Sequence, residues 1–128
     1  MTSRSSRCRA TCVRRVTCRP SAFLPTTSLL VHHGGSGTTA APLHYGVPQL
    51  VLPSFADNPL SAQRVVERGV GLSHDPARIT VGGVRDMVRR LLDEPELVVN
   101  ARAVADEMAG QVSPSDVLQR AVSKARTE

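Results

Sequence analysis

Aromatic residues are nearly absent from this chain of 128 residues. It has no tryptophan, one tyrosine and two phenylalanines, and aromatics make up 2% of the sequence. Sites for single-stranded nucleic acid stack the bases on aromatic side chains, so the composition argues against such a platform. An apolar content of 41%, carried by Val, Leu and Ala, suits one globular domain with a single core.

Acidic residues are missing from the first 20 residues, which contain six arginines. The chain has a formal net charge of +5, but taking these six from its 16 basic residues leaves ten basic against 11 acidic residues. The basic character therefore belongs to a tail, residues 1–20, which lacks any periodicity and is predicted to be disordered. A nucleic-acid binder working through this tail is an alternative that the near-neutral remainder disfavours.

Cysteine is confined to the same tail, at Cys8, Cys12 and Cys18. The spacings match no common zinc pattern, and an odd number of cysteines with no expected secretory signal argues against a disulfide framework. We therefore expect a reduced, cytoplasmic protein. No stretch approaches the roughly 18 apolar residues that cross a bilayer, so we expect no membrane span.

From residue 21 onward, short apolar runs alternate with helical patterns. Three apolar runs predict buried strands: 29–31, 48–53 and 70–73. Two helices are predicted between them, each closed by a glycine: from Thr38 or Thr39 to Tyr45 before Gly46, and from Asn58 to Arg68 before Gly69. This alternation is typical of parallel βαβ units, so the predicted class is α/β with three short parallel strands.

The remaining residues predict three packing helices with solvated outer faces. Their apolar periodicity covers residues 81–93, 95–109 and about 114–124. In the first of them, the expected apolar face consists of Val84, Val88, Leu91 and Leu92. The last begins at a Ser-Pro-Ser-Asp stretch, in which Ser113 is the expected N-cap and Asp116 the acidic residue of the first turn.

A glycine-rich stretch, Val31–Thr39 (VHHGGSGTT), separates the first strand from the first helix. His32 and His33 point to opposite faces of a strand, so one metal ion cannot easily bind both. Glycines before a helix let the backbone approach a ligand, and the helix N-terminus attracts anions. The stretch is neither a Walker loop nor G-x-G-x-x-G, and its local residues leave open both an anion site and a turn required only for packing.

A longer stretch, residues 32–71, combines five motifs: H-x-G-x-x-x-T, G-V-P-Q, a Leu-Pro run, an Asp-Asn pair and A-x-R-V-x-x-x-G-x-G. At these spacings it resembles the donor-binding half of the UDP-glycosyltransferase superfamily, in particular the bacterial branch that glycosylates macrolides and other antibiotics. The resemblance covers about residues 23–122. It implies that residues 21–128 form a partial Rossmann-like domain, the C-terminal part of a GT-B glycosyltransferase. Such a domain holds a UDP- or dTDP-sugar as substrate and needs neither a metal nor a cofactor.

The resemblance also implies roles for individual residues. His32 would contact the donor diphosphate, whereas His33 is expected to be structural. The donor sugar hydroxyls would bind Asp57 and Asn58, where relatives often have Asp-Gln. No catalytic residue is expected, because the histidine that activates the acceptor belongs to the N-terminal domain of this family. The residues expected to surround the phosphates are Gly34, Gly35, Ser36, Gly37 and Thr38.

The expected function is that of an incomplete glycosyltransferase. The chain would bind the diphosphate of a nucleotide-sugar, its ancestor would transfer the sugar to a small molecule such as a macrolide, and the chain alone would be inactive. Residues 1–20 have a composition that suits an out-of-frame translation, so we expect a truncated or frameshifted product. The alternative is a non-catalytic module that docks with a separate N-terminal half, and a homo-oligomer is a further expected partner. Sheet edges left exposed where missing strands should pair would favour aggregation.

Overall fold

A computed structural model describes residues 19–55 and 58–127 of the chain. Three strands form one parallel sheet in the order β1-β2-β3, with Val31 beside Leu50 and Leu50 beside Leu72. This arrangement confirms the predicted class. The predictions made for residues 1–18 and for Asp57 lie outside the described residues. The strands are β1 Leu30–His32, β2 Gln49–Val51 and β3 Gly71–Ser73.

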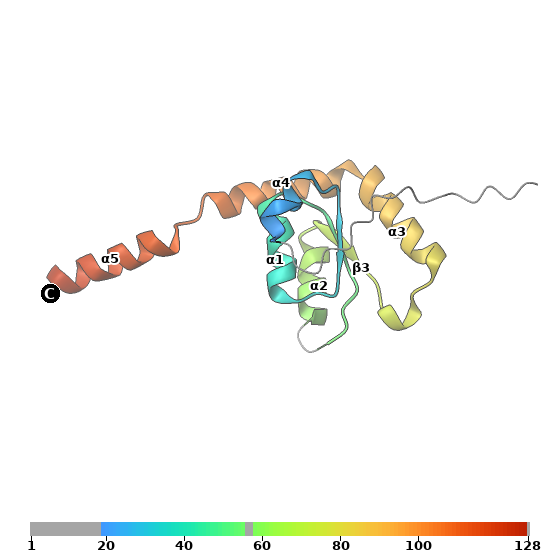
Figure 1. Cartoon of the computed structure of the whole chain (residues 1–128), viewed down its shortest axis with the longest axis horizontal. Helices are drawn as coiled ribbons and strands as arrows, with labels where there is room; N and C mark the ends of the chain where they lie inside the picture. Colours follow the sequence, from blue (N-terminus) through green and yellow to red (C-terminus); the bar gives the residue numbers. More distant parts are fainter. Residues whose placement is uncertain (1–18, 56–57, 128) are drawn as a thin grey trace, which may run out of the picture.

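Helices cover both faces of the sheet (Figure 1). Helices α1 and α2 lie on one face and α3 on the other, while α4 crosses the amino end of the strands. Three short 3₁₀ turns complete the described chain: η1 Pro20–Ala22, η2 Leu24–Thr26 and η3 Pro76–Arg78. The α-helices are α1 Ser36–His44, α2 Asn58–Glu67, α3 Val81–Asp93, α4 Pro95–Ala109 and α5 Pro114–Thr127.

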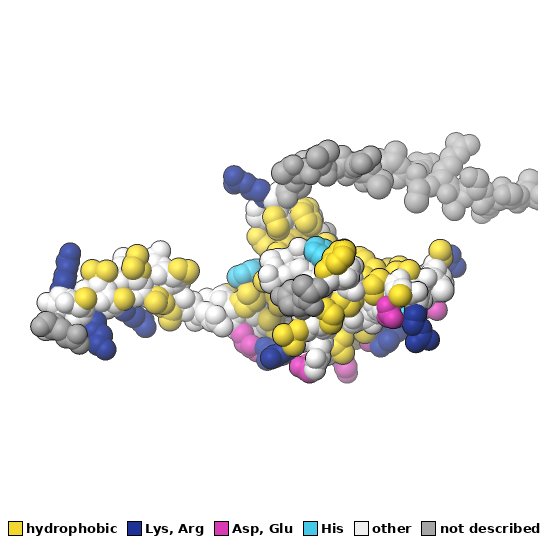
Figure 2. All heavy atoms as spheres, turned by 90° about the horizontal axis from the view of Figure 1, so that it is seen from below, with side chains coloured by type: hydrophobic (Ala, Val, Ile, Leu, Met, Phe, Trp, Pro, Cys, Tyr) yellow, Lys and Arg dark blue, Asp and Glu magenta, His cyan; other side chains and the backbone are white. Residues whose placement is uncertain are grey.

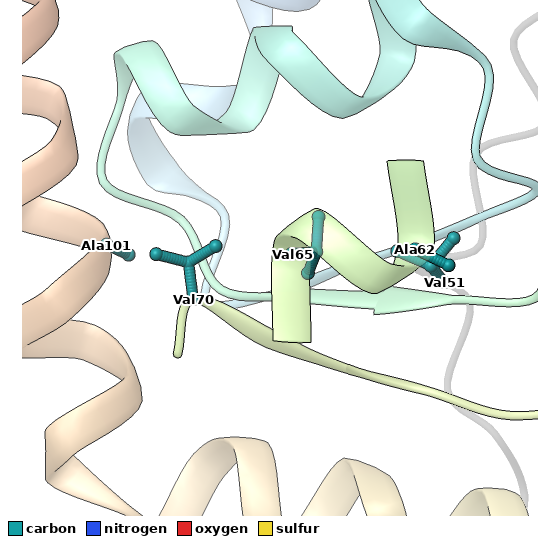
Figure 3. Close-up of a cluster of buried hydrophobic side chains, with 5 residues drawn as sticks. All are labelled: Val51, Ala62, Val65, Val70 and Ala101. Carbon is teal, nitrogen blue, oxygen red and sulfur yellow. The ribbon is translucent and has the colours of Figure 1, made fainter. Parts of the chain in front are cut away.

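The first core lies between the sheet and helices α1, α2 and α4. Figure 3 shows its side chains converging from β2, α2, the residue before β3 and α4. Leu43 of α1 packs against the cluster from the side. Because the cluster joins four elements that are distant in sequence, it fixes α1 and α2 against the sheet. Its members are Val51, Ala62, Val65, Val70 and Ala101.

The second core lies under α3. Leu50 of β2 meets Leu91 of α3 and Leu97 of α4, with Leu72 and Val88 packed around them. Since α4 contributes Leu97 here and Ala101 to the first core, this helix ties the two faces together at one end of the sheet.

Two predicted glycine stops end helices α1 and α2. Gly46 and Gly69 both have φ of +64°, in the left-handed region where glycine is favoured. Helix α4 lies directly against both: a Cβ on Gly46 would be 3.0 Å from Cγ of Arg102, and one on Gly69 would be 2.7 Å from Nδ2 of Asn100. These glycines therefore serve the packing of α4 as well as the turns.

The structure corrects two expectations of burial. The first strand is not buried on both faces, since Val31 is 43% exposed; α3 covers β2 and β3 but leaves this side of β1 open. Leu92, expected on the apolar face of α3, is also exposed because Leu91 takes the position that faces the sheet.

Helix boundaries agree with the predictions to within a few residues. Helices α3 and α4 have the expected bounds, and α5 extends three residues beyond the expected Lys124. Helix α1 begins at Ser36, two or three residues earlier than expected, because Gly35 takes the N-cap position. Helix α2 includes Asn58 as its first residue rather than as its cap.

The last helix does not pack as predicted. Residues 114–127 form α5, with Ser113 Oγ accepting a hydrogen bond from the Asp116 N–H at 3.1 Å, as a capping residue does. No residue of α5 is buried, and the helix extends away from the sheet and the other helices (Figure 1). Within the described ranges, no helix is long and apolar enough to cross a membrane.

Candidate functional site

The turn between β1 and α1 lies at the carboxyl end of the parallel strands, where open α/β sheets bind their ligands. Gly34 has φ of +93°, and a Cβ there would be 3.0 Å from Cγ1 of Val51 and 3.2 Å from Cβ of Asn58. Only glycine satisfies both the backbone and the space at this position. The contact brings the start of α2 directly against the turn.

The first turn of α1 is open to solvent. Ser36, Gly37 and Thr38 are exposed, and their N–H groups precede the first intrahelical donor, Thr39, whose N–H bonds to the Gly35 carbonyl at 2.8 Å. The hydroxyl of Thr39 donates to the same carbonyl, also at 2.8 Å. The N–H groups of residues 36–38 therefore have no acceptor within the helix, and the Ser36 and Thr38 side chains add two hydroxyls. These N–H groups carry the partial positive charge of the helix N-terminus, which is suited to an anion.

A basic side chain lines the groove between helices α1 and α2. Arg64 of α2 borders this groove together with Ser36, Thr39, Leu60 and Ser61. It also borders a second groove with Leu43 of α1 and Val104 of α4. The positive charge of Arg64 therefore belongs to the groove beside α1 and favours a negatively charged ligand there.

The two adjacent histidines occupy different environments, as their strand positions predict. His32 is 9% exposed, and both of its ring nitrogens have partners. Its Nδ1 accepts a hydrogen bond from the Gly34 N–H at 3.0 Å, and its Nε2 lies 2.6 Å from Oε1 of Gln49. Because a backbone N–H can only donate, the ring proton must be on Nε2, which donates to Gln49.

Burial lowers the pKa of His32 below its usual value. The hydrogen bond to Gln49 acts in the opposite direction, and the neighbouring His33 adds to the lowering. The ring is therefore neutral at physiological pH. A direct contact between His32 and a phosphate would require Nε2 to leave or share Gln49, and this predicted contact stays a prediction.

His33 is the exposed imidazole of the pair. Its ring lies over Gly35, where a Cβ would be 2.9 Å from Nε2, so glycine at the N-cap makes room for it. This places an imidazole beside the open N-terminus of α1. The sequence contained a signal for this position, because the spacing H-x-G-x-x-x-T also fits His33, Gly35 and Thr39.

The predicted site residues are brought together in part. Gly34 through Thr38 form the turn and the first turn of α1, and the buried Asn58 contacts Gly34. Asp57 is outside the described residues. Across residues 19–55 and 58–127, no three His, Cys, Asp or Glu side chains gather as a metal site would require. Gln49, which the sequence did not single out for the site, lies beneath the turn.

A parallel sheet with a glycine turn and an open helix N-terminus at its carboxyl edge defines part of a Rossmann-like α/β domain. Comparison with known families then gives the group. Residues 7–123 match the family described as "Erythromycin biosynthesis protein CIII-like, C-terminal domain", and the chain belongs to this family. It is a C-terminal domain of the antibiotic glycosyltransferase type, with the GT-B fold predicted from its motifs. The match begins at residue 7, inside the tail and earlier than the expected residue 23.

Individual relatives agree with this assignment. The elloramycin glycosyltransferase ElmGT of Streptomyces olivaceus is 47% identical over 97 residues, which are 76% of this chain and 24% of that protein. The crystal structure of the glycosyltransferase VinC in complex with dTDP aligns with a TM-score of 0.77 and 34% identity, over 85% of this chain and 28% of VinC.

The glycosyltransferase SsfS6 of Streptomyces sp. SF2575, complexed with thymidine diphosphate, aligns with a TM-score of 0.70 and 35% identity. This alignment covers 80% of the present chain and 27% of SsfS6. The chain thus spans about a quarter of the length of the relatives it matches.

Proposed function

We propose that this domain binds the diphosphate of a nucleotide-sugar donor, a dTDP- or UDP-sugar. The observation that carries the proposal is the open first turn of α1 beside the Gly34–Gly35 turn. The fold is shared with two glycosyltransferases, VinC and SsfS6, whose structures hold thymidine diphosphate (dTDP). The phosphates would accept hydrogen bonds from the N–H groups of residues 36–38 and from the Ser36 and Thr38 hydroxyls. Asp57 and Asn58 would bind the sugar hydroxyls.

His33 is better placed than His32 to contact the phosphates. Its exposed imidazole lies against the N-cap of α1, within the region that a diphosphate would occupy. His32, in contrast, has both ring nitrogens engaged by Gly34 and Gln49. We therefore assign the phosphate contact in the first place to His33, with His32 beneath the turn.

The proposed reaction of the complete enzyme is transfer of the sugar to a small-molecule acceptor such as a macrolide. The proposed reaction needs no cofactor, because the nucleotide-sugar is itself a substrate. Its leaving group is the nucleoside diphosphate, and the turn would hold the diphosphate part. The domain by itself would bind donor without transferring sugar, since the acceptor must be activated in the same geometry. We also propose a cytoplasmic location, because cysteines stay reduced there and the expected substrate is a nucleotide-sugar.

Titration calorimetry of the folded chain with dTDP, UDP and thymidine tests the binding proposal. Both diphosphates should bind and thymidine, which lacks phosphates, should bind about tenfold or more weakly, because charged hydrogen bonds supply most of the affinity. A folded chain that binds none of them at millimolar concentration, or that binds thymidine as well as dTDP, contradicts the proposal.

A matched pair of charge variants locates the site. Thr38→Asp adds a carboxylate to the first turn of α1, which favours the helix but repels a phosphate, so dTDP binding should fall about tenfold. Ser115→Asp makes the same change in the first turn of α5 and should leave binding unchanged. Equal effects of the two variants would contradict a site at α1.

A docking module is the second candidate, favoured by a specific observation on α5. This helix exposes apolar side chains along its length, which are visible beside its basic residues in Figure 2. The large exposed apolar residues of α5 are Val117, Leu118 and Val122, and Val112 is exposed just before the helix. Analytical ultracentrifugation of the chain with and without residues 113–128 tests this function: loss of a complex or dimer on deletion supports it, and a monomer in both cases contradicts it.

A further inference from the structure

Gln49 is a buried polar side chain in a strand whose other two residues, Leu50 and Val51, are apolar. It begins β2, is 0% exposed and lies on the same side of the sheet as Val51 and the first core. Burying an amide is unfavourable unless both of its ends are hydrogen-bonded. Both are: Oε1 lies 2.6 Å from Nε2 of His32, and Nε2 donates to the Thr39 carbonyl at 3.1 Å.

These contacts form a relay with one possible direction. The Gly34 N–H donates to Nδ1 of His32, Nε2–H of His32 donates to Gln49, and the Gln49 amide donates to the Thr39 carbonyl. The first group is a backbone donor and the last is a backbone acceptor, and neither can reverse its role. The orientation of the amide and the tautomer of the imidazole are therefore fixed by each other.

The relay holds both ends of one short segment. Gly34 at its start is tied through His32, and Thr39 at its end is tied directly to the Gln49 amide. The residues between these two anchors are 35–38, and residues 36–38 face solvent at the α1 N-terminus. One buried side chain thus fixes the spacing of the anchors and, with it, the shape of the open segment.

Gln49 meets this requirement in a way that similar side chains do not. Glutamate has the same shape but no N–H for the Thr39 carbonyl, and its charge would favour a proton on Nδ1 of His32, which would oppose the Gly34 N–H. Methionine has a similar volume but neither the donor nor the acceptor.

We propose that Gln49, acting through His32 and Thr39, is a positioning residue that preorganises the donor diphosphate site. The inference rests on the proposed function, because the segment it holds is the proposed phosphate seat. Ligand affinity depends on such preorganisation, since a segment that must be ordered on binding loses part of the binding free energy.

The test compares Gln49→Met with Leu91→Ala, which removes a buried side chain from the second core, outside the relay. Binding of dTDP is measured at a temperature where unfolding curves show both variants folded. Gln49→Met should bind about tenfold more weakly than the wild type, and Leu91→Ala should stay within about twofold of it. Gln49→Glu, which keeps the side-chain shape, should also bind about tenfold more weakly and serves if the methionine variant does not fold.

An NMR signature separates positioning from general destabilisation. In the wild type, the ¹⁵N signals of His32 should be those of a neutral ring with its proton on Nε2, and the Gly34 amide should exchange slowly. Gln49→Met should lose both features, Gln49→Glu should show a protonated His32 at neutral pH, and Leu91→Ala should keep the wild-type pattern.

The outcomes separate the two proposals. If the folded wild type does not bind dTDP while the His32 and Gly34 signals have the predicted form, the proposed function fails and the positioning role fails with it. If the wild type binds and both Gln49 variants bind equally well, only the positioning role is overturned. It is also overturned if Leu91→Ala weakens binding as much as they do, or if the His32 tautomer is unchanged in Gln49→Met.

Discussion

The two sides of the β1–α1 turn differ in what holds them. On the inner side, His32, Gly34 and Thr39 are buried and joined through Gln49, with the Gly34 backbone pressed against Val51 and Asn58. On the outer side, His33 and residues 36–38 face solvent. Neighbouring residues of one motif therefore have separate tasks: the inner ones determine the shape of the turn, and the outer ones are available to a ligand.

The largest expected effect comes from filling the inner side of the turn. Gly34→Ala forces an alanine into the left-handed backbone conformation of Gly34, and its Cβ would be 3.0 Å from Cγ1 of Val51 and 3.2 Å from Cβ of Asn58. We expect the free energy of unfolding to fall by about 3 kcal/mol. Urea unfolding measures it, with Gly37→Ala as the control.

Gly37 lies on the outer side, and nothing is within 4 Å of a Cβ built there. Since alanine is the better helix former, Gly37→Ala should raise stability by about 0.5–1 kcal/mol. If the two alanine variants destabilise the protein equally, the division of the turn into a packed and an open side is wrong.

A smaller loss is expected when the relay loses its imidazole. His32→Phe keeps an aromatic ring but leaves the Gly34 N–H and the Gln49 amide oxygen without their partners, so stability should fall by about 2 kcal/mol. Thermal unfolding checks this. A variant as stable as the wild type would mean that the relay contributes no net stability.

The neighbouring histidine should show the opposite pattern. His33→Ala removes an exposed ring, so stability should change by no more than about 0.5 kcal/mol. Binding of dTDP should nevertheless weaken about tenfold, because a hydrogen bond to a charged group is lost. Calorimetry and unfolding on the same preparation measure both quantities. A drop in stability with unchanged binding would reverse the roles of the two histidines.

The smallest effect is a pH dependence of stability that comes from His32. Its pKa is lowered in the folded state, mainly by burial, so below about pH 6.5 the unfolded chain takes up this proton more readily than the folded chain. The contribution of His32 to stability is therefore complete above this pH and decreases as the pH falls through the lowered pKa. Urea unfolding from about pH 8 to about pH 5 should show the stability difference between wild type and His32→Phe shrinking toward acid. A constant difference contradicts the assignment.

The local signals of the sequence predicted most of the fold. The glycines at 46 and 69 and the apolar periodicity of residues 81–109 predicted helix ends and helices, because backbone preference and helical spacing act over a few residues. The exposure of Val31 was missed, because an apolar run does not reveal which strand lies at the edge of a sheet.

The candidate site was predicted by chemistry more than by geometry. The motif predicted a diphosphate and the residues around it, with His32 as its contact and His33 as structural. The same spacing fits the motif from His33 as well, so the sequence alone does not fix which imidazole is buried. Gln49 was recognised only as part of a motif, since its contact with His32 spans 17 positions in the sequence. Helix α5 has the same kind of apolar periodicity as α4, and only the arrangement of the other elements showed that α4 is packed and α5 is exposed.

The sequence by itself determined the α/β class and the glycine turn before α1, and it predicted the class of ligand, because turn chemistry and residue spacing are local properties. The tertiary structure decided which histidine is buried, which helix lacks a partner and which glutamine lies beneath the turn. These depend on the pairing of β1 with β2 and on the space that α1, α2 and α4 leave between them, and no stretch of a few residues contains that information.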